Sequence, residues 1–255
     1  MKSISLYVDN GTYLTKVHPF TKLMYIAAAI SIPLIGGRLW LFGCLIAASL
    51  CLLASGKLLK RTLPLIAFSF TILITIFLIH GLFNQNNTNV LFKLGPLRFY
   101  REGLYYALRI GLNILNMLLS FAVFVLSTKP SELVDELEKH GFSPRLGYII
   151  SSVFQIIPQM TGTMSTIMDA QRSRGLETEG NLKTRAKAFL PLISPVVMSS
   201  LINTRERAIA LEVRGFGSSQ KKTWLADRTP HKGDRAVTIL LGLMILGAII
   251  GRIGA

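Results

Sequence analysis

Two short segments of the chain repeat one pattern, in which polar or small residues are followed by arginine, glycine and a large apolar residue. The first segment is Gln171-Arg172-Ser173-Arg174-Gly175-Leu176-Glu177, and the second is Leu211-Glu212-Val213-Arg214-Gly215-Phe216-Gly217. Arginine keeps its charge in proteins, and its planar fork pairs with a carboxylate through two hydrogen bonds. Arg174 and Arg214 are therefore candidates for insertion into an acidic groove on a partner protein.

The same pattern is also typical of an ordinary helix end. Glycine is common just beyond the last helical turn, and a basic side chain there interacts favourably with the helix dipole. Capping alone would explain one such end. Two ends that are 40 residues apart, each on a charged segment beside an amphipathic helix, favour a pair of contacts with two halves of a dimeric partner. Closure of those halves would drag both helices as rigid bodies.

Residues for catalysis, metal binding and nucleotide binding form no recognisable group. The nearest approach to a phosphate-binding loop is Gly175 to Gly180, and it lacks the required lysine and hydroxyl. The histidines have no metal-ligand spacing, and they are His18, His80, His140 and His231. Clustered carboxylates have the spacing of a solvated helical turn, and they are Glu132, Asp135, Glu136 and Glu138. The sequence therefore predicts no catalytic residue, no metal site and no cofactor bound by this chain.

The composition indicates an integral membrane protein. Hydrophobic residues make up 51% of the 255 residues, charged residues only 16%, and the mean hydropathy is +0.48. A bilayer span needs about 20 largely apolar residues, and five stretches contain no Asp, Glu, Lys or Arg: Thr62–Phe92, Ile110–Thr128, Leu146–Met168, Ala188–Thr204 and Ala236–Gly251. The net charge is +15, and the basic residues lie beside these charge-free stretches. This arrangement is typical of the cytoplasmic loops of a membrane protein and not of a nucleic-acid-binding surface.

The elements that must position the two arginines are helices. We predict an all-α integral membrane protein with about five transmembrane helices. Clear spans cover Leu63–Phe83, Leu104–Leu126 and Ala236–Gly251, whereas Leu23–Ile35 and Leu39–Ala54 could form a tight hairpin or one interrupted element. The positive-inside rule places the basic loop at Lys57, and with it the N-terminus, in the cytoplasm.

The charged middle of the chain is expected to form a cytoplasmic region of amphipathic coupling helices. We predict three parts: N-terminal transmembrane helices over 1–128, the coupling-helix region over 129–235, and a C-terminal transmembrane helix over 236–255. Leu146–Met168 and Ala188–Thr204 carry prolines and polar residues, so we interpret them as helices at or partly in the membrane. The alternative is that both are further full spans.

The order of these features resembles the transmembrane T component (EcfT/CbiQ type) of energy-coupling factor (ECF) transporters. The resemblance covers most of the chain and rests on an early His18-Pro19, on Ser127-Thr128-Lys129-Pro130, on Gln155-Ile156-Ile157-Pro158 and on the two Arg-Gly segments. The family's hallmark is two Ala-Arg-Gly motifs that end coupling helices. Here they read Ser173-Arg174-Gly175 and Val213-Arg214-Gly215, so the first position departs from Ala both times.

The resemblance implies a non-enzymatic subunit of a bacterial or archaeal inner membrane. It implies that the two motifs contact two ABC-type ATPases, identical or different, and that Gln171, Arg172, Glu212 and Phe216 support them. The ATPases would bind ATP, and a small membrane capture (S) protein would bring in a vitamin or metal ion. Selectivity for the transported substrate would then lie in the capture subunit.

Two other functions compete with this expectation. A conventional ABC importer permease would dock its ATPase through a different short loop, and Glu206-Arg207-Ala208 lacks the glycine that such a loop needs. A membrane enzyme acting on lipid phosphates would need arginine, histidine and aspartate at one membrane face, but no histidine lies near Arg174 or Arg214 in sequence.

Overall fold

The computed structural model describes residues 7, 10–83, 89–94, 97–176, 181–218, 223 and 231–253, and these are almost entirely helical. The chain divides into two compact units. One comprises residues 6–129 and 228–255 and is called the transmembrane unit here. The other comprises residues 1–5 and 130–227 and is called the coupling unit.

The transmembrane unit contains α1 (Tyr13–Lys16), α2 (Pro19–Gly36), α3 (Leu39–Ser55), α4 (Leu59–Phe83), α5 (Arg101–Ser127) and α9 (Lys232–Ile253). Four of them are long and apolar enough to cross a bilayer, namely α2, α4, α5 and α9. The apolar helix α3 is shorter, with 17 residues. This set confirms the predicted all-α membrane protein.

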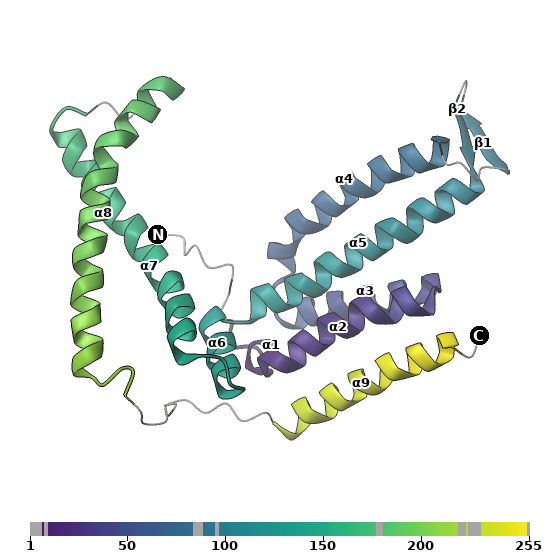
Figure 1. The fold of residues 1–255 in the computed structure, drawn as a ribbon. Helices are drawn as coiled ribbons and strands as arrows, with labels where there is room; N and C mark the ends of the chain where they lie inside the picture. The colour runs from purple at the N-terminus through teal and green to yellow at the C-terminus, as the bar shows by residue number, and fades with distance from the viewer. Residues whose placement is uncertain are drawn as a thin grey trace. The chain divides into compact units, whose positions relative to one another are not determined.

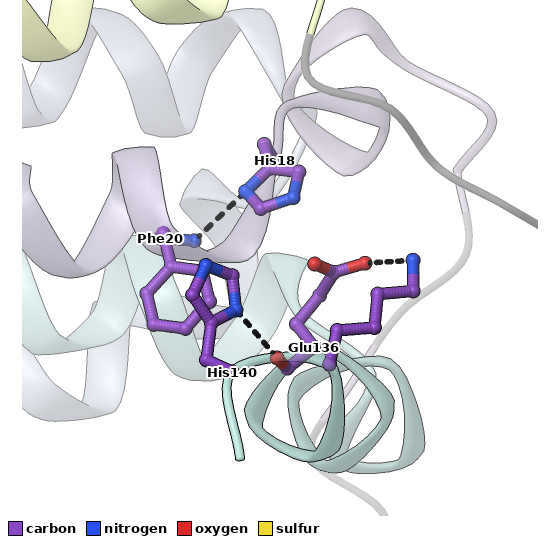
Figure 2. A network of polar contacts seen from close by, with 5 residues as sticks. His18, Phe20, Glu136 and His140 are labelled. Carbon is purple, nitrogen blue, oxygen red and sulfur yellow. Dashed lines mark hydrogen bonds and ion pairs between the residues drawn. The ribbon is translucent and has the colours of Figure 1, made fainter. Parts of the chain in front are cut away.

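Residues 23–54 form two helices and not one interrupted element. Pro19 occupies the first position of α2, and the Nδ1 atom of His18 accepts a hydrogen bond from the backbone N–H of Phe20 at 3.3 Å, which caps the helix start (Figure 2). The helix ends at Gly36, and Gly37 adopts φ +64°, a left-handed conformation that suits glycine. The chain then turns directly into α3.

Buried apolar side chains and a few polar contacts hold the transmembrane unit together. Its core consists of Leu14, Leu53, Leu58, Leu119, Ala122, Val123 and Leu126. Helix α5 is joined to α2 by a hydrogen bond from Asn116 Nδ2 to the carbonyl of Ala29 at 2.6 Å, a kind of contact by which polar side chains join membrane helices. Tyr25 and Ser49 share a hydrogen bond of 2.7 Å between α2 and α3.

Helices α4 and α5 lie side by side, and a small β-hairpin lies at their end (Figure 1). Its strands, β1 (Val90–Leu94) and β2 (Leu97–Tyr100), pair antiparallel. In sequence, residues 90–100 are only a short apolar and basic patch. Five- and four-residue strands are too short to show a persuasive alternation, so the hairpin could not be predicted.

The coupling unit contains α6 (Pro130–Lys139), α7 (Pro144–Ser173) and α8 (Leu182–Val213). Ser131 followed by acidic residues is typical of a helix start, Lys139-His140-Gly141 is typical of a helix end, and α6 runs between them. Helices α7 and α8 are much longer than the charge-free stretches at 146–168 and 188–204. Neither is among the described helices that qualify as membrane spans.

Candidate coupling site

The first Arg-Gly segment is the C-terminal end of α7. The backbone N–H of Gly175 donates to the carbonyl of Arg172 at 2.9 Å, and that of Leu176 donates to the carbonyl of Gln171 at 3.0 Å. This pair of bonds defines a Schellman motif. Gly175 has φ +87°, which a residue with a β carbon adopts only with strain. Arg174 is therefore the C-cap residue of a sharply ended helix.

The second Arg-Gly segment ends α8 in the same way. Gly215 N–H donates to Glu212 O at 2.9 Å, Phe216 N–H donates to Leu211 O at 2.9 Å, and Gly215 has φ +76°. The repeat seen in the sequence is thus a repeat of backbone geometry. Both arginines stand at the same position of the same motif.

A third helix end in this unit shows what the arginines add. Helix α6 also ends in a Schellman motif, since Phe142 N–H donates to Leu137 O at 3.0 Å and Gly141 has φ +100°. The residue at its end is His140, whose Nδ1 lies 2.9 Å from the carbonyl of Glu136 on the same helix (Figure 2). His140 therefore turns back onto its own helix, and the capping geometry by itself does not make a docking site.

The six residues of the two motifs are exposed, and they are Ser173, Arg174, Gly175, Val213, Arg214 and Gly215. Val213 is 84% exposed. Neither glycine has any atom within 4 Å of the position that a β carbon would occupy. Within the described parts of the chain, the guanidinium groups of Arg174 and Arg214 have neither a hydrogen bond nor an ion pair. Both charged groups are therefore available for a partner.

The four supporting residues act in different ways. The backbone carbonyl of Gln171 accepts hydrogen bonds from Arg174 and Leu176, and that of Glu212 accepts one from Gly215. The guanidinium of Arg172 lies 3.8 Å from Asp169 on the same helix, so it is partly engaged within α7. The ring of Phe216 lies 5.0 Å from that of Tyr148, and this contact holds the end of α8 against the beginning of α7.

Helices α7 and α8 run antiparallel, so their Arg-Gly ends point away from each other (Figure 1). Arg207 Nη2 donates to Gln159 Oε1 at 2.9 Å where the helices meet. From that contact α7 continues for about 20 Å to Ser173, and α8 continues for roughly 10 Å in the opposite direction to Val213, at 1.5 Å per residue. One small acidic pocket could not accept both arginines.

The sequence alone does not single out the residues that set this arrangement, namely Tyr148, Gln159 and Arg207. Each is a single polar or aromatic side chain on a long helix. No spacing within one helix reveals that its partner lies about 50 or more residues away in the chain. The Gln159–Arg207 pair also lies beside a small cavity that includes Met160, Thr163 and Asn203.

Comparison with known protein families identifies the chain. Residues 11–224 match the model of the CbiQ family, described as cobalt transport protein. This chain belongs to the CbiQ family. The match spans both Arg-Gly segments and all the helices except α9, so it covers the transmembrane and coupling units alike.

Curated relatives of this CbiQ-family chain are named energy-coupling factor transporter transmembrane protein EcfT. The protein from Staphylococcus aureus is 29% identical over 86% of this chain and 85% of the relative. The protein from Thermosediminibacter oceani is 25% identical over 98% of this chain and 97% of the relative. The protein from Bacillus subtilis is 26% identical over 97% of this chain and 96% of the relative. The chain is therefore a transmembrane T component of an ECF transporter and a multi-pass membrane protein, as its resemblance implied.

Proposed function

We propose that this T component couples two cytoplasmic ABC-type ATPases to a small substrate-capture membrane protein, and that Arg174 and Arg214 are its two ATPase contacts. The observation that carries the proposal is the pair of exposed arginines at the C-terminal ends of α7 and α8. Because the two helices are antiparallel, these arginines lie at opposite ends of the helix pair. Each guanidinium can enter an acidic groove on a separate subunit and pair with a carboxylate through two hydrogen bonds.

Rigid helix ends suit the transmission of movement. A displacement applied to Arg174 or Arg214 acts on a helix of 30 or 32 residues whose end is held by two backbone hydrogen bonds. Contacts of α7 with α8 through Gln159 and Tyr148 carry that displacement into the other helix. ATP-driven closure of the two ATPases would therefore shift the α7–α8 pair as a unit.

The apolar surface of the coupling unit suits a membrane partner. Large hydrophobic side chains are exposed on α7 and α8, among them Ile149, Val153, Phe154, Leu190, Met198 and Leu201. A patch of this kind is typical of a protein or membrane interface. We assign it to the capture protein, whose reorientation would release a vitamin or metal ion inside the cell.

In this proposal the chain itself has no catalytic residue and binds no cofactor. ATP is bound and hydrolysed by the partner subunits, which can be identical or different.

Charge reversal of both arginines tests the proposal. The full-length variant Arg174→Glu with Arg214→Glu is expected to lose co-purifying ATPases and substrate uptake, because a carboxylate would face an acidic groove. Each single reversal should weaken assembly without abolishing it. Arg205→Glu is the matched control, since Arg205 is also exposed on α8 but lies two turns before the helix end.

Assembly and uptake at the level of the unaltered protein in the double variant would overturn the assignment of the two arginines. The same loss in Arg205→Glu would show that any charge reversal on α8 disrupts the complex, which would also remove the support for a specific contact. Thermal unfolding of each variant in detergent separates loss of contact from loss of fold.

A further inference from the structure

Two arginines from different helices converge at the C-terminal end of α2. Arg109 Nη2 on α5 and Arg252 Nη1 on α9 lie 3.8 Å and 4.0 Å from the position that a β carbon would occupy on Gly37. Arg38 follows directly in the chain. Three guanidinium groups therefore belong to one end of the transmembrane unit, and all three side chains are exposed.

These cations have no protein counter-charge in the described structure. The guanidinium groups of Arg38, Arg109 and Arg252 form no hydrogen bond or ion pair with a described residue. The two guanidinium nitrogens near Gly37 are separated by less than about 8 Å, so the groups repel each other. The carbonyl ends of α2 and α9 each supply only about half a negative charge. The cluster keeps a net positive charge that an anion would neutralise.

The surroundings indicate which anion fits. Trp40 and Leu34, on either side of the turn at Gly37, are each 59% exposed. Exposed tryptophan is typical of the level of lipid headgroups, and exposed leucine is typical of the hydrocarbon next to it. Ile250 and Ile253 are also exposed on α9 beside Arg252. The three arginines therefore lie where a polar headgroup meets acyl chains.

We propose that Arg38, Arg109 and Arg252 bind the phosphate of an anionic phospholipid at this end of the transmembrane unit. Arginine is the side chain best suited to phosphate, because its planar fork donates two parallel hydrogen bonds to phosphate oxygens. The acyl chains of the lipid lie along the exposed apolar side chains of α2 and α9. The bound lipid holds α5 and the ends of α2 and α9 together by neutralising the charges that push them apart.

The site lies at the opposite end of α2 from His18 and Lys22. Positive charge is normally concentrated at the cytoplasmic ends of spans, and the loop at Lys57 accounts for that end. A bound anionic lipid gives a physical reason for keeping three further arginines at the other end.

Native mass spectrometry of the full-length chain in detergent tests the proposal. Phosphatidylglycerol should be retained at least tenfold more than phosphatidylcholine, and Arg109→Gln with Arg252→Gln should remove that preference. The matched control is Lys60→Gln with Arg61→Gln, which removes two exposed charges from the start of α4. This control should keep the preference for phosphatidylglycerol. The variant Arg252→Lys, which keeps the charge but loses the fork, should retain an intermediate amount.

Equal retention of the two lipids by the unaltered protein would overturn the proposal, and so would an unchanged preference in the Arg109/Arg252 variant. Competition with inorganic phosphate distinguishes a lipid headgroup from free phosphate as the ligand. Displacement of the lipid by equimolar inorganic phosphate would show a site for free phosphate and would overturn the lipid assignment. Phosphatidylglycerol should also raise the unfolding temperature of the unaltered chain and the control, but not that of the double variant.

Discussion

At the scale of single residues, the two arginines are distinguished by what their side chains do and not by the turn that holds them. His140, Arg174 and Arg214 occupy the same position in three Schellman motifs. His140 contacts its own helix, whereas Arg174 and Arg214 extend from exposed ends without a described partner. The glycine after each one makes the sharp end possible.

Replacing that glycine tests the backbone geometry directly. Gly215→Ala should destabilise the chain by about 1–2 kcal/mol, because a β carbon is strained in the left-handed conformation at φ +76°. No atom lies within 4 Å of the new carbon, so crowding does not contribute. The measurement is thermal unfolding in detergent.

Gly162→Ala in the middle of α7 is the control. It also adds a β carbon in open space, but in a helical conformation, and it should be neutral or stabilising by up to about 1 kcal/mol. An equal loss of stability in both variants would contradict the conformational explanation.

Val213 stands at the first position of the second motif, where the family's motif has alanine. The variant Val213→Ala tests whether this difference affects the contact with the ATPases. Val213 is 84% exposed, so its truncation leaves no cavity, and alanine is the better helix former by about 0.5 kcal/mol. We expect unchanged or slightly higher thermal stability and equal or stronger retention of the ATPases in a pull-down. Weaker retention would show that the valine side chain itself contributes to the contact.

At the scale of elements, a buried lysine fixes the end of α5. Lys22 on α2 is 4% exposed, and its Nζ donates to the carbonyl of Ser127 at 2.8 Å. Ser127 is the last residue of α5, whose final carbonyls have no partner within the helix. The ammonium group satisfies one of them and complements the negative end of the helix dipole. Helix α5 therefore ends at a defined place just before the coupling unit begins.

Lys22→Met should cost roughly 1–3 kcal/mol of stability, because it leaves a buried carbonyl without its donor while keeping a side chain of similar length. The measurement is again thermal unfolding in detergent. Lys16→Met removes an exposed charge from α1 and should change the stability little. If both variants unfold at the temperature of the unaltered chain, the hydrogen bond to Ser127 does not stabilise the fold.

At the scale of the whole molecule, the two units are joined by connections of very different length. Only Thr128 and Lys129 separate the end of α5 from the beginning of α6. A second connection runs from the end of α8 to Lys232 and is more than a dozen residues long. Under the proposed function, a displacement of the coupling unit reaches the transmembrane unit through the short connection.

Insertion of two glycines between Lys129 and Pro130 should therefore uncouple the units. We expect ATPase co-purification to persist and substrate uptake to fall several-fold, because glycine lets the connection absorb the displacement. The same insertion after Thr223, in the long connection, should leave uptake near that of the unaltered protein. Uptake that survives the first insertion would show that movement does not pass through residues 128–129.

Much of the fold could be predicted because the relevant signals are local in sequence. Charge-free stretches such as Leu63–Phe83 indicate spans wherever they occur, and α4 and α5 confirm them. Charge-free stretches underestimated the lengths of α7 and α8, because an absence of charge indicates an apolar environment and not where a helix begins and ends. The Gly37 turn was ambiguous for a related reason, because a glycine pair can either bend or end a helix.

The sequence by itself determined that the chain enters a membrane, and that two helices end in an arginine followed by glycine. Both properties depend on local composition and on the backbone freedom of single residues. Only the tertiary structure decided that those ends point in opposite directions, that Lys22 holds the end of α5, and that Arg109 and Arg252 meet at Gly37. These arrangements join residues about 50 to more than 200 positions apart, so they depend on how helices pack and not on any pattern within one of them.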